Sequence, residues 1–126
     1  MKLVKAFIRT TKVDEVIRAL RAAGAPGITI SRVHGVGYGY EPLLFTLAPS
    51  EIKKAPAVAK IEVVCDDDAV DELLTEILKA ANTGYPGDGI VFVTPVEQAI
   101  KIRTGDEAPQ SLNRRENTVV PKGGDS

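Results

Sequence analysis

The chain has 126 residues with a formal net charge of −1; 44% of its residues are hydrophobic and 26% are charged. This composition predicts one globular domain with a modest core, and it argues against nucleic acid or a membrane surface as the main partner. A single cysteine, no signal-peptide pattern and no apolar run near the roughly 20 residues that span a membrane predict a cytoplasmic protein without direct membrane insertion.

The first third of the chain predicts a strand, a helix and a second strand. Residues 2–9 alternate in part between apolar and charged side chains, which is typical of a strand. Apolar residues at helical spacing follow, at Val13, Val16, Ile17 and Leu20. Thr11 and Asp14 are spaced as in a capping box at the start of this helix, and Gly24 marks its end. The β-branched residues of 28–36 predict the second strand.

Residues 38–57 have no clear period and contain three prolines, Pro42, Pro49 and Pro56. A loop of this length inside a compact domain is uncommon and is usually functional. It also carries apolar side chains, at Leu43, Leu44, Phe45, Leu47 and Ile52. These side chains either form a surface for a partner protein or pack on the domain itself or on a neighbouring subunit, and the sequence leaves both interpretations open.

The second half predicts a strand at 58–65, a helix and a strand at about 90–93. The helix has one apolar face, formed by Val70, Leu73, Leu74, Ile77 and Ala81. Asp66, Asp67 and Asp68 precede it, and without nearby His or Cys ligands they favour a charged helix start over a metal site. We expect a short helical turn at 95–99, a strand at 100–103 and a polar, disordered end.

The stretch 83–93 holds three glycines, Gly84, Gly87 and Gly89, with Asp88 between the last two. Glycines permit positive φ, and a Gly-Asp-Gly turn can aim successive N–H groups at one point, as a phosphate requires. The alternative is an ordinary helix-to-strand turn. In an extended segment Lys101 and Arg103 would share one face, and this pair of cations favours the anion site.

The element order predicts an α+β, ferredoxin-like (βαββαβ) antiparallel sheet with two helices on one face and a second face that needs another subunit. An RNA-recognition module would need stacking aromatics and a basic sheet, which are missing. A Rossmann site is excluded because Gly35, Gly37 and Gly39 open a proline-bearing loop and not a helix. His34 is the only histidine and no catalytic constellation is present, so we expect no enzyme.

Three segments resemble the PII family of nitrogen-regulatory signal transduction proteins. They are KVDEVIRALRAAGAPGITISRVHGVG (12–37), KIEVVCDDDAVDELLTEILKAANTGYPGDG (60–89) and FVTPVEQAIKIRTGD (92–106), about 70 of the 126 residues. The resemblance implies a homotrimer with no prosthetic group and with adenine nucleotides in the clefts between subunits. It also divides the chain into a domain at 1–106, with a T-loop at about 38–57, a B-loop at 83–89 and a C-loop at about 95–106, and a tail at 107–126.

The same resemblance implies a set of nucleotide-binding residues. Gly87, Asp88 and Gly89 match the B-loop phosphate cradle, and Lys101 and Arg103 stand where the family places two arginines on the phosphates. Four further positions match those that line adenine and ribose: Thr29, Gly35, Gly37 and Val64. Tyr38 and Ile90 stand where typical members have an arginine and a lysine that hold phosphates.

These departures modify the expected function. With two cations lost, ADP or AMP should bind at least as well as ATP. Gly39 and Val58 replace the glutamine and lysine that serve 2-oxoglutarate, so we expect no usual 2-oxoglutarate response. Glu51 replaces the tyrosine that is modified in the family.

The implied function is a divergent nucleotide sensor that regulates a transporter or enzyme through residues 38–57. A link to nitrogen or inorganic-carbon metabolism, with bicarbonate as a second ligand, remains open. The alternative is a ligand-independent trimeric scaffold that uses its apolar loop; a divalent-cation-binding trimer of the CutA type is a more distant one.

Overall fold

The structure, a computed structural model, describes residues 1–35 and 57–107. The predictions for Gly37, Tyr38, Gly39, nearly all of the T-loop range and the tail from residue 108 lie outside these described residues. The secondary structure elements are β1 (Lys2–Arg9), α1 (Val13–Ala22), β2 (Thr29–His34), β3 (Ala57–Cys65), α2 (Val70–Ala81) and β4 (Ile90–Pro95). Short 3₁₀ turns, Thr10–Lys12 and Asp67–Ala69, precede the two helices.

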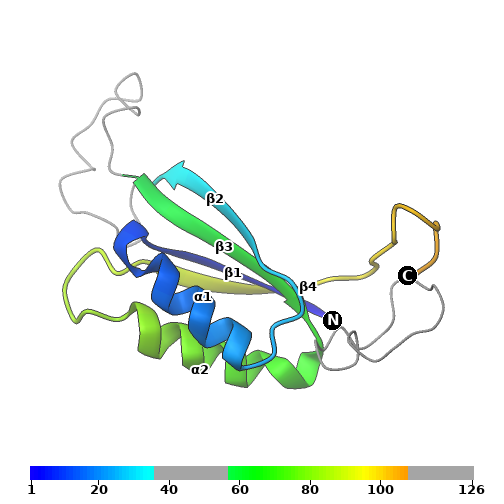
Figure 1. The fold of residues 1–126 in the computed structure, drawn as a ribbon, viewed down its shortest axis with the longest axis horizontal. Coiled ribbons are helices and arrows are strands. Elements are labelled where there is room, and N and C mark those ends of the chain that lie inside the picture. The colour runs from blue at the N-terminus through cyan, green and yellow to red at the C-terminus, as the bar shows by residue number, and fades with distance from the viewer. Residues whose placement is uncertain (36–56, 108–126) are drawn as a thin grey trace.

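The strands form one sheet in the order β2-β3-β1-β4, and every neighbouring pair is antiparallel. Both helices lie on the same side of this sheet and pack beside each other (Figure 1). This is the predicted ferredoxin-like α+β fold, with β1 and β3 in the centre and β2 and β4 at the edges.

The core lies between the sheet and the helices because the strands alternate their side chains between two faces. In β1, Val4, Ala6 and Ile8 are at most 2% exposed, and the residues between them are half-buried. Helical residues at i, i+3 and i+4 spacing pack against this face of the sheet. They are Val16 and Leu20 of α1 and Leu73, Ile77 and Ala81 of α2, all part of one buried cluster.

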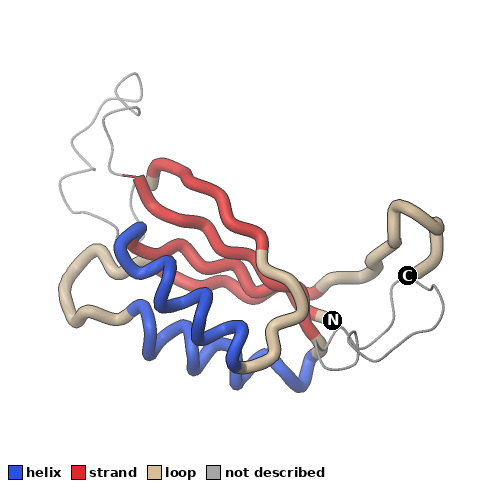
Figure 2. The backbone as a smooth tube through the Cα atoms, in the orientation of Figure 1, coloured by secondary structure: helices blue, strands red, loops and turns tan. Residues whose placement is uncertain are grey.

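The opposite face of the sheet carries both apolar and charged side chains. Phe7 of β1 pairs with Ile90 of β4, and its ring meets that of Phe92 edge to face with centroids 6.2 Å apart. Phe92 is 39% exposed. Among the described residues no helix or strand covers this face (Figure 2). The expectation that another subunit covers it stays a prediction.

The start of α1 differs from the predicted capping box. The helix begins at Val13 after a 3₁₀ turn, and Lys12, the residue before it, makes no side-chain capping hydrogen bond. The preceding 3₁₀ turn takes the place of a Thr11 cap, so the prediction from Thr11 and Asp14 is wrong. The acidic residues before α2 also make no side-chain cap, and no His/Cys/Asp/Glu group suited to a metal occurs in residues 1–35 and 57–107.

The region after β4 also differs from the prediction. Residues 96–99 are irregular and not helical, and residues 102–104 form a turn and not a strand. Ile100 pairs with Glu107 in an isolated bridge. The N–H of Lys101 donates to the Asp106 carbonyl at 2.9 Å, and the N–H of Gly105 donates to the Lys101 carbonyl at 2.8 Å. We call residues 100–107 the C-terminal turn; Gly105, at φ 76°, permits this chain reversal.

Cys65 ends β3 and is 1% exposed, as a small buried hydrophobe would be. Burial, followed by the negative charge of Asp66, raises the pKa of its thiol. In the part of the chain that the structure describes, no helix has the length and apolar character needed to cross a membrane.

Candidate functional site

Residues 83–89, which we call the glycine loop, connect the end of α2 to β4. Gly84, Gly87 and Gly89 have φ values of 84°, 102° and 101°, a region that L-residues with side chains rarely adopt. The predicted need for glycine at these positions is therefore confirmed. Tyr85, at the tip of the loop, is 73% exposed.

The Asp88 carboxylate organises the glycine loop from within. Its Oδ2 accepts hydrogen bonds from the backbone N–H groups of Thr83 at 2.8 Å and Gly84 at 3.0 Å. Its Oδ1 accepts a hydrogen bond from the Thr83 hydroxyl at 2.5 Å. The loop thus holds an anion of its own at one end. A phosphate could use the N–H groups of Thr83 and Gly84 only by displacing this carboxylate.

Arg9, at the end of β1, joins the glycine loop to the sheet. Its Nε donates to Asp88 Oδ1 at 3.0 Å, and its Nη2 donates to the Pro86 carbonyl at 2.6 Å. Such charge-assisted contacts are stronger than neutral hydrogen bonds. Sequence analysis missed Arg9. One signal was available. Arg9 is a cation at the end of β1, and the ferredoxin-like strand order places β1 beside β4, the strand that follows the glycine loop.

A side chain at position 89 is excluded by a steric clash as well as by the positive φ. A Cβ atom at this position would lie 1.8 Å from the Phe7 carbonyl oxygen and 2.9 Å from its carbon. Real Cβ atoms do not approach backbone atoms so closely, so the β1 and β4 backbones can meet here only because the side chain is absent. The close approach fixes where the glycine loop joins β4.

Asp88→Asn should remove a pH-dependent part of the stability. Hydrogen bonds from the Thr83 hydroxyl, and next from its backbone N–H, hold the pKa of Asp88 well below its ordinary value of 3.8. A depressed folded-state pKa stabilises the protein fully above that ordinary value, and the stabilisation is lost as pH falls through the folded-state pKa. Urea unfolding measured at decreasing pH should therefore show a steeper acid loss for the wild type than for the variant.

Thr83→Val is the companion variant, because it removes the strongest of these donors and keeps the carboxylate. Its acid loss of stability should lie between those of the wild type and Asp88→Asn. Parallel pH profiles for the wild type and Asp88→Asn would contradict the role of the carboxylate.

The predicted binding residues divide between the two ends of the sheet. One end, which we call the loop end, carries the glycine loop, Ile90 and Gly35, because β1 and β2 finish where β3 and β4 begin. Gly35 and Gly87 are buried there, and Asp88, Gly89 and Ile90 are half-buried.

The other end, which we call the turn end, carries Thr29, Val64 and the C-terminal turn. Thr29 pairs with Glu62 and Val64 with Leu3, near the finish of β3. Lys101 and Arg103 are exposed in the C-terminal turn. They do not share a strand face, since this segment is a turn, and Figure 1 shows it at the far end of β4 from the glycine loop. One chain therefore does not bring these cations to the glycines.

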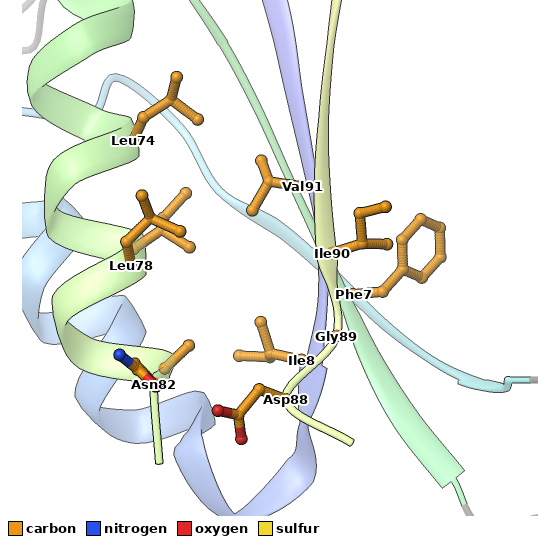
Figure 3. A pocket seen from close by; sticks show the side chains of 11 residues that line it. Phe7, Ile8, Leu74, Leu78, Asn82, Asp88, Gly89, Ile90 and Val91 are labelled. Carbon is orange, nitrogen blue, oxygen red and sulfur yellow. The ribbon is translucent and has the colours of Figure 1, made fainter. Parts of the chain in front are cut away.

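A groove of about 590 Å³ lies between α2 and β4, next to the glycine loop. Leu74 and Leu78 point into it from α2, and Val91 faces them from β4 (Figure 3). Asp88 and Asn82 supply polar atoms at one end, while Phe7 and Ile90 point to the other side of the sheet. Its lining is mostly apolar.

The fold and the loop define a class: a ferredoxin-like α+β protein whose glycine-rich helix-to-strand connection is built around an anion. The sequence model of the family described as "Nitrogen regulatory protein P-II" matches residues 1–106. The chain is 40% identical over 112 residues to a nitrogen regulatory protein P-II of Nostoc punctiforme and 44% identical over 114 residues to one of Cereibacter sphaeroides. Each match covers 89% of this chain and all of the relative.

A protein of the same description from Azospirillum brasilense is 40% identical over 114 residues, with the same coverage. The chain therefore belongs to the nitrogen regulatory protein P-II family. It is a signalling protein of a family whose members are regulatory proteins and not enzymes. Homotrimers and nucleotide binding are typical of this family.

Proposed function

We propose that this chain binds an adenine nucleotide in clefts between its copies and regulates a partner protein through residues 38–57. ADP and AMP bind at least as well as ATP, and the usual 2-oxoglutarate response is absent. The observation that carries the proposal is the division of the binding residues between the two ends of the sheet.

The division has a simple geometric consequence. The six residues of β4 span roughly 20 Å, so one nucleotide phosphate cannot contact both the glycine loop and the C-terminal turn of one chain. If the loop end of one copy meets the turn end of the next, each cleft receives both sets. A head-to-tail contact gives a closed ring when the rotation between successive copies sums to a full turn, and a homotrimer is the smallest ring of this kind.

The charges available in such a cleft support the nucleotide preference. Lys101 and Arg103 would supply the cations from the turn end. Ile90, at the loop end, is apolar where typical members have a lysine. Because a hydrogen bond to a charged group contributes about 1.5–3 kcal/mol, losing cations reduces the advantage of a longer phosphate chain. Val58, at the position of the 2-oxoglutarate lysine, is a 6% exposed apolar residue and offers no ligand.

The regulatory step follows from the location of the glycine loop. Gly35, the last described residue before the T-loop range, lies at the same end of the sheet as the glycine loop. A nucleotide at this end would bind differently to different arrangements of residues 38–57 and so shift their populations. The regulated partner, a transporter or enzyme, would read that shift.

Arg103→Ala and Gly87→Ala should each abolish most nucleotide binding, and mixing them should restore part of it. The first variant lacks a cation at the turn end, and the second strains the loop end at φ 102°. In randomly mixed rings, roughly a quarter of the clefts combine an intact loop end with an intact turn end. Isothermal titration with AMP, ADP and ATP measures the recovered sites.

Arg18→Ala, which removes an exposed cation from the middle of α1, is the matched control and should bind like the wild type. Wild-type protein that binds no nucleotide, or mixed oligomers without recovered sites, would refute the proposal. ATP binding tighter than ADP by about tenfold, or 1.4 kcal/mol, would refute the stated preference. A saturable effect of 2-oxoglutarate with Mg-ATP would refute the expected insensitivity.

The second candidate function is a ligand-independent scaffold. Two observations favour it: the Asp88 carboxylate already accepts N–H groups of the glycine loop, and Ile102 in the C-terminal turn is 99% exposed. Exposed apolar side chains suit a protein partner. Partner binding by protein that takes up no nucleotide would select this function over the first.

A further inference from the structure

The contacts of Arg9 lie on both sides of Gly87. One guanidinium nitrogen, Nε, binds the Asp88 carboxylate at 3.0 Å, and another, Nη2, binds the Pro86 carbonyl at 2.6 Å. The Arg9 and Asp88 side chains are 30% and 24% exposed, so water screens this pair only in part. A planar guanidinium suits this double contact, whereas an ammonium group is a point donor.

We propose that Arg9 is a positioning residue that clamps the glycine loop in the arrangement used for phosphate binding and neutralises the Asp88 carboxylate there. The phosphate part of this inference rests on the function proposed above; the clamp itself does not. Neither the resemblance nor the glycine pattern assigns a role to Arg9.

The electrostatic reason is the negative charge that the glycine loop carries. Asp88 holds the loop together by accepting N–H groups, yet its charge would repel an incoming phosphate. Arg9 offsets that charge at the carboxylate itself. The loop therefore keeps a rigid internal anion without presenting a net negative charge to the ligand.

The structural reason is that Arg9 belongs to the sheet. β1 pairs with β4 from Lys2↔Pro95 to Phe7↔Ile90, and Arg9, two residues further along β1, still pairs with Val58 of β3. The guanidinium thus connects the loop to a central strand and not to another loop. The close approach of Gly89 to Phe7 fixes one end of the glycine loop, and Arg9 fixes the middle.

The first test measures the clamp without any ligand, by amide hydrogen exchange of the full chain. In Arg9→Gln the amides of Thr83 and Gly84, which donate to Asp88, should exchange about tenfold faster, because a charge-assisted contact is lost. The Gly105 amide, bonded in the C-terminal turn, is the internal control and should not change. Unchanged exchange at Thr83 and Gly84 would overturn the clamp.

The second test measures the phosphate role by titration with ADP and with adenosine. Arg9→Gln should weaken ADP about tenfold or more and leave adenosine unchanged, because only the phosphates depend on the glycine loop. Arg18→Gln, with the same change in charge on α1, should alter neither. Equal losses for both ligands, or no loss, would overturn the phosphate role of Arg9.

Two further variants keep the tests decisive if Arg9→Gln does not fold. Arg9→Lys keeps the charge but not the fork, and its exchange and ADP affinity should lie between those of wild type and Arg9→Gln; wild-type values would overturn the proposal. In an Asp88→Asn background the effect of Arg9→Lys should be smaller than in the wild type, because only the contact with the Pro86 carbonyl remains to be altered. Fully additive effects of the two substitutions would overturn the proposal. Wild-type protein that binds no nucleotide refutes the proposed function, while the exchange data still decide the clamp.

Discussion

Gly89→Ala should lower the free energy of unfolding by at least about 3 kcal/mol. Two effects add at this position: the φ of 101° disfavours any side chain, and the new Cβ would lie 1.8 Å from the Phe7 carbonyl oxygen. That oxygen belongs to the backbone of a central strand, so it cannot rotate away as a side chain would. Urea or guanidinium unfolding, monitored by circular dichroism, measures the loss.

Gly84→Ala is the matched control in the same loop. Its φ is 84°, but no heavy atom lies within 4 Å of the added Cβ, so only the backbone preference is lost. We expect a reduction of about 1–2 kcal/mol. Equal losses at Gly84 and Gly89 would show that the contact with Phe7 has no energetic role.

Leu73→Ala should be the other strongly destabilising change, with a loss of about 2–5 kcal/mol. Leu73 is 1% exposed and belongs to the cluster that packs the helices on the sheet. Truncation removes buried methyl groups and leaves a cavity that neighbouring side chains fill only in part. Equilibrium unfolding of the purified variant gives the difference directly.

Leu78→Ala tests the same helix on its exposed side. Leu78 is 59% exposed and lines the groove beside β4, so its truncation should change stability by less than about 0.5 kcal/mol. A loss as large as that of Leu73→Ala would contradict this expectation and would mean that the groove is filled in solution.

The fold could be predicted from periodicity and element order. The helices around Val16 and Leu73 and the alternating strands are long enough for their periods to be unambiguous, and the order of elements leaves few topologies. The errors fall on short segments. The four residues 100–103 alternate like a strand, but the turn chemistry of Thr104 and Gly105 outweighs that brief pattern: the Asp106 N–H donates to the Thr104 hydroxyl at 3.2 Å.

The candidate site could be predicted only in part. Glycines with positive φ follow from the local sequence, because conformational preference is a local property. The contact between Arg9 and Asp88 spans 79 positions, and no local pattern reveals which distant cation meets the loop. The role of Asp88 was missed for a related reason. The sequence shows that an aspartate is present, but it does not show whether its carboxylate accepts hydrogen bonds from its own loop or from groups elsewhere.

The burial of Cys65 has a practical consequence for spectroscopy. It is the only cysteine of the chain, it is 1% exposed, and its raised pKa disfavours the reactive thiolate. The protein therefore needs no background substitution before thiol labelling. A cysteine introduced by Tyr85→Cys or Ile102→Cys would react with a fluorophore or spin label in preference to Cys65. Distances between such labels would test whether the loop end of one copy approaches the turn end of another, as proposed above.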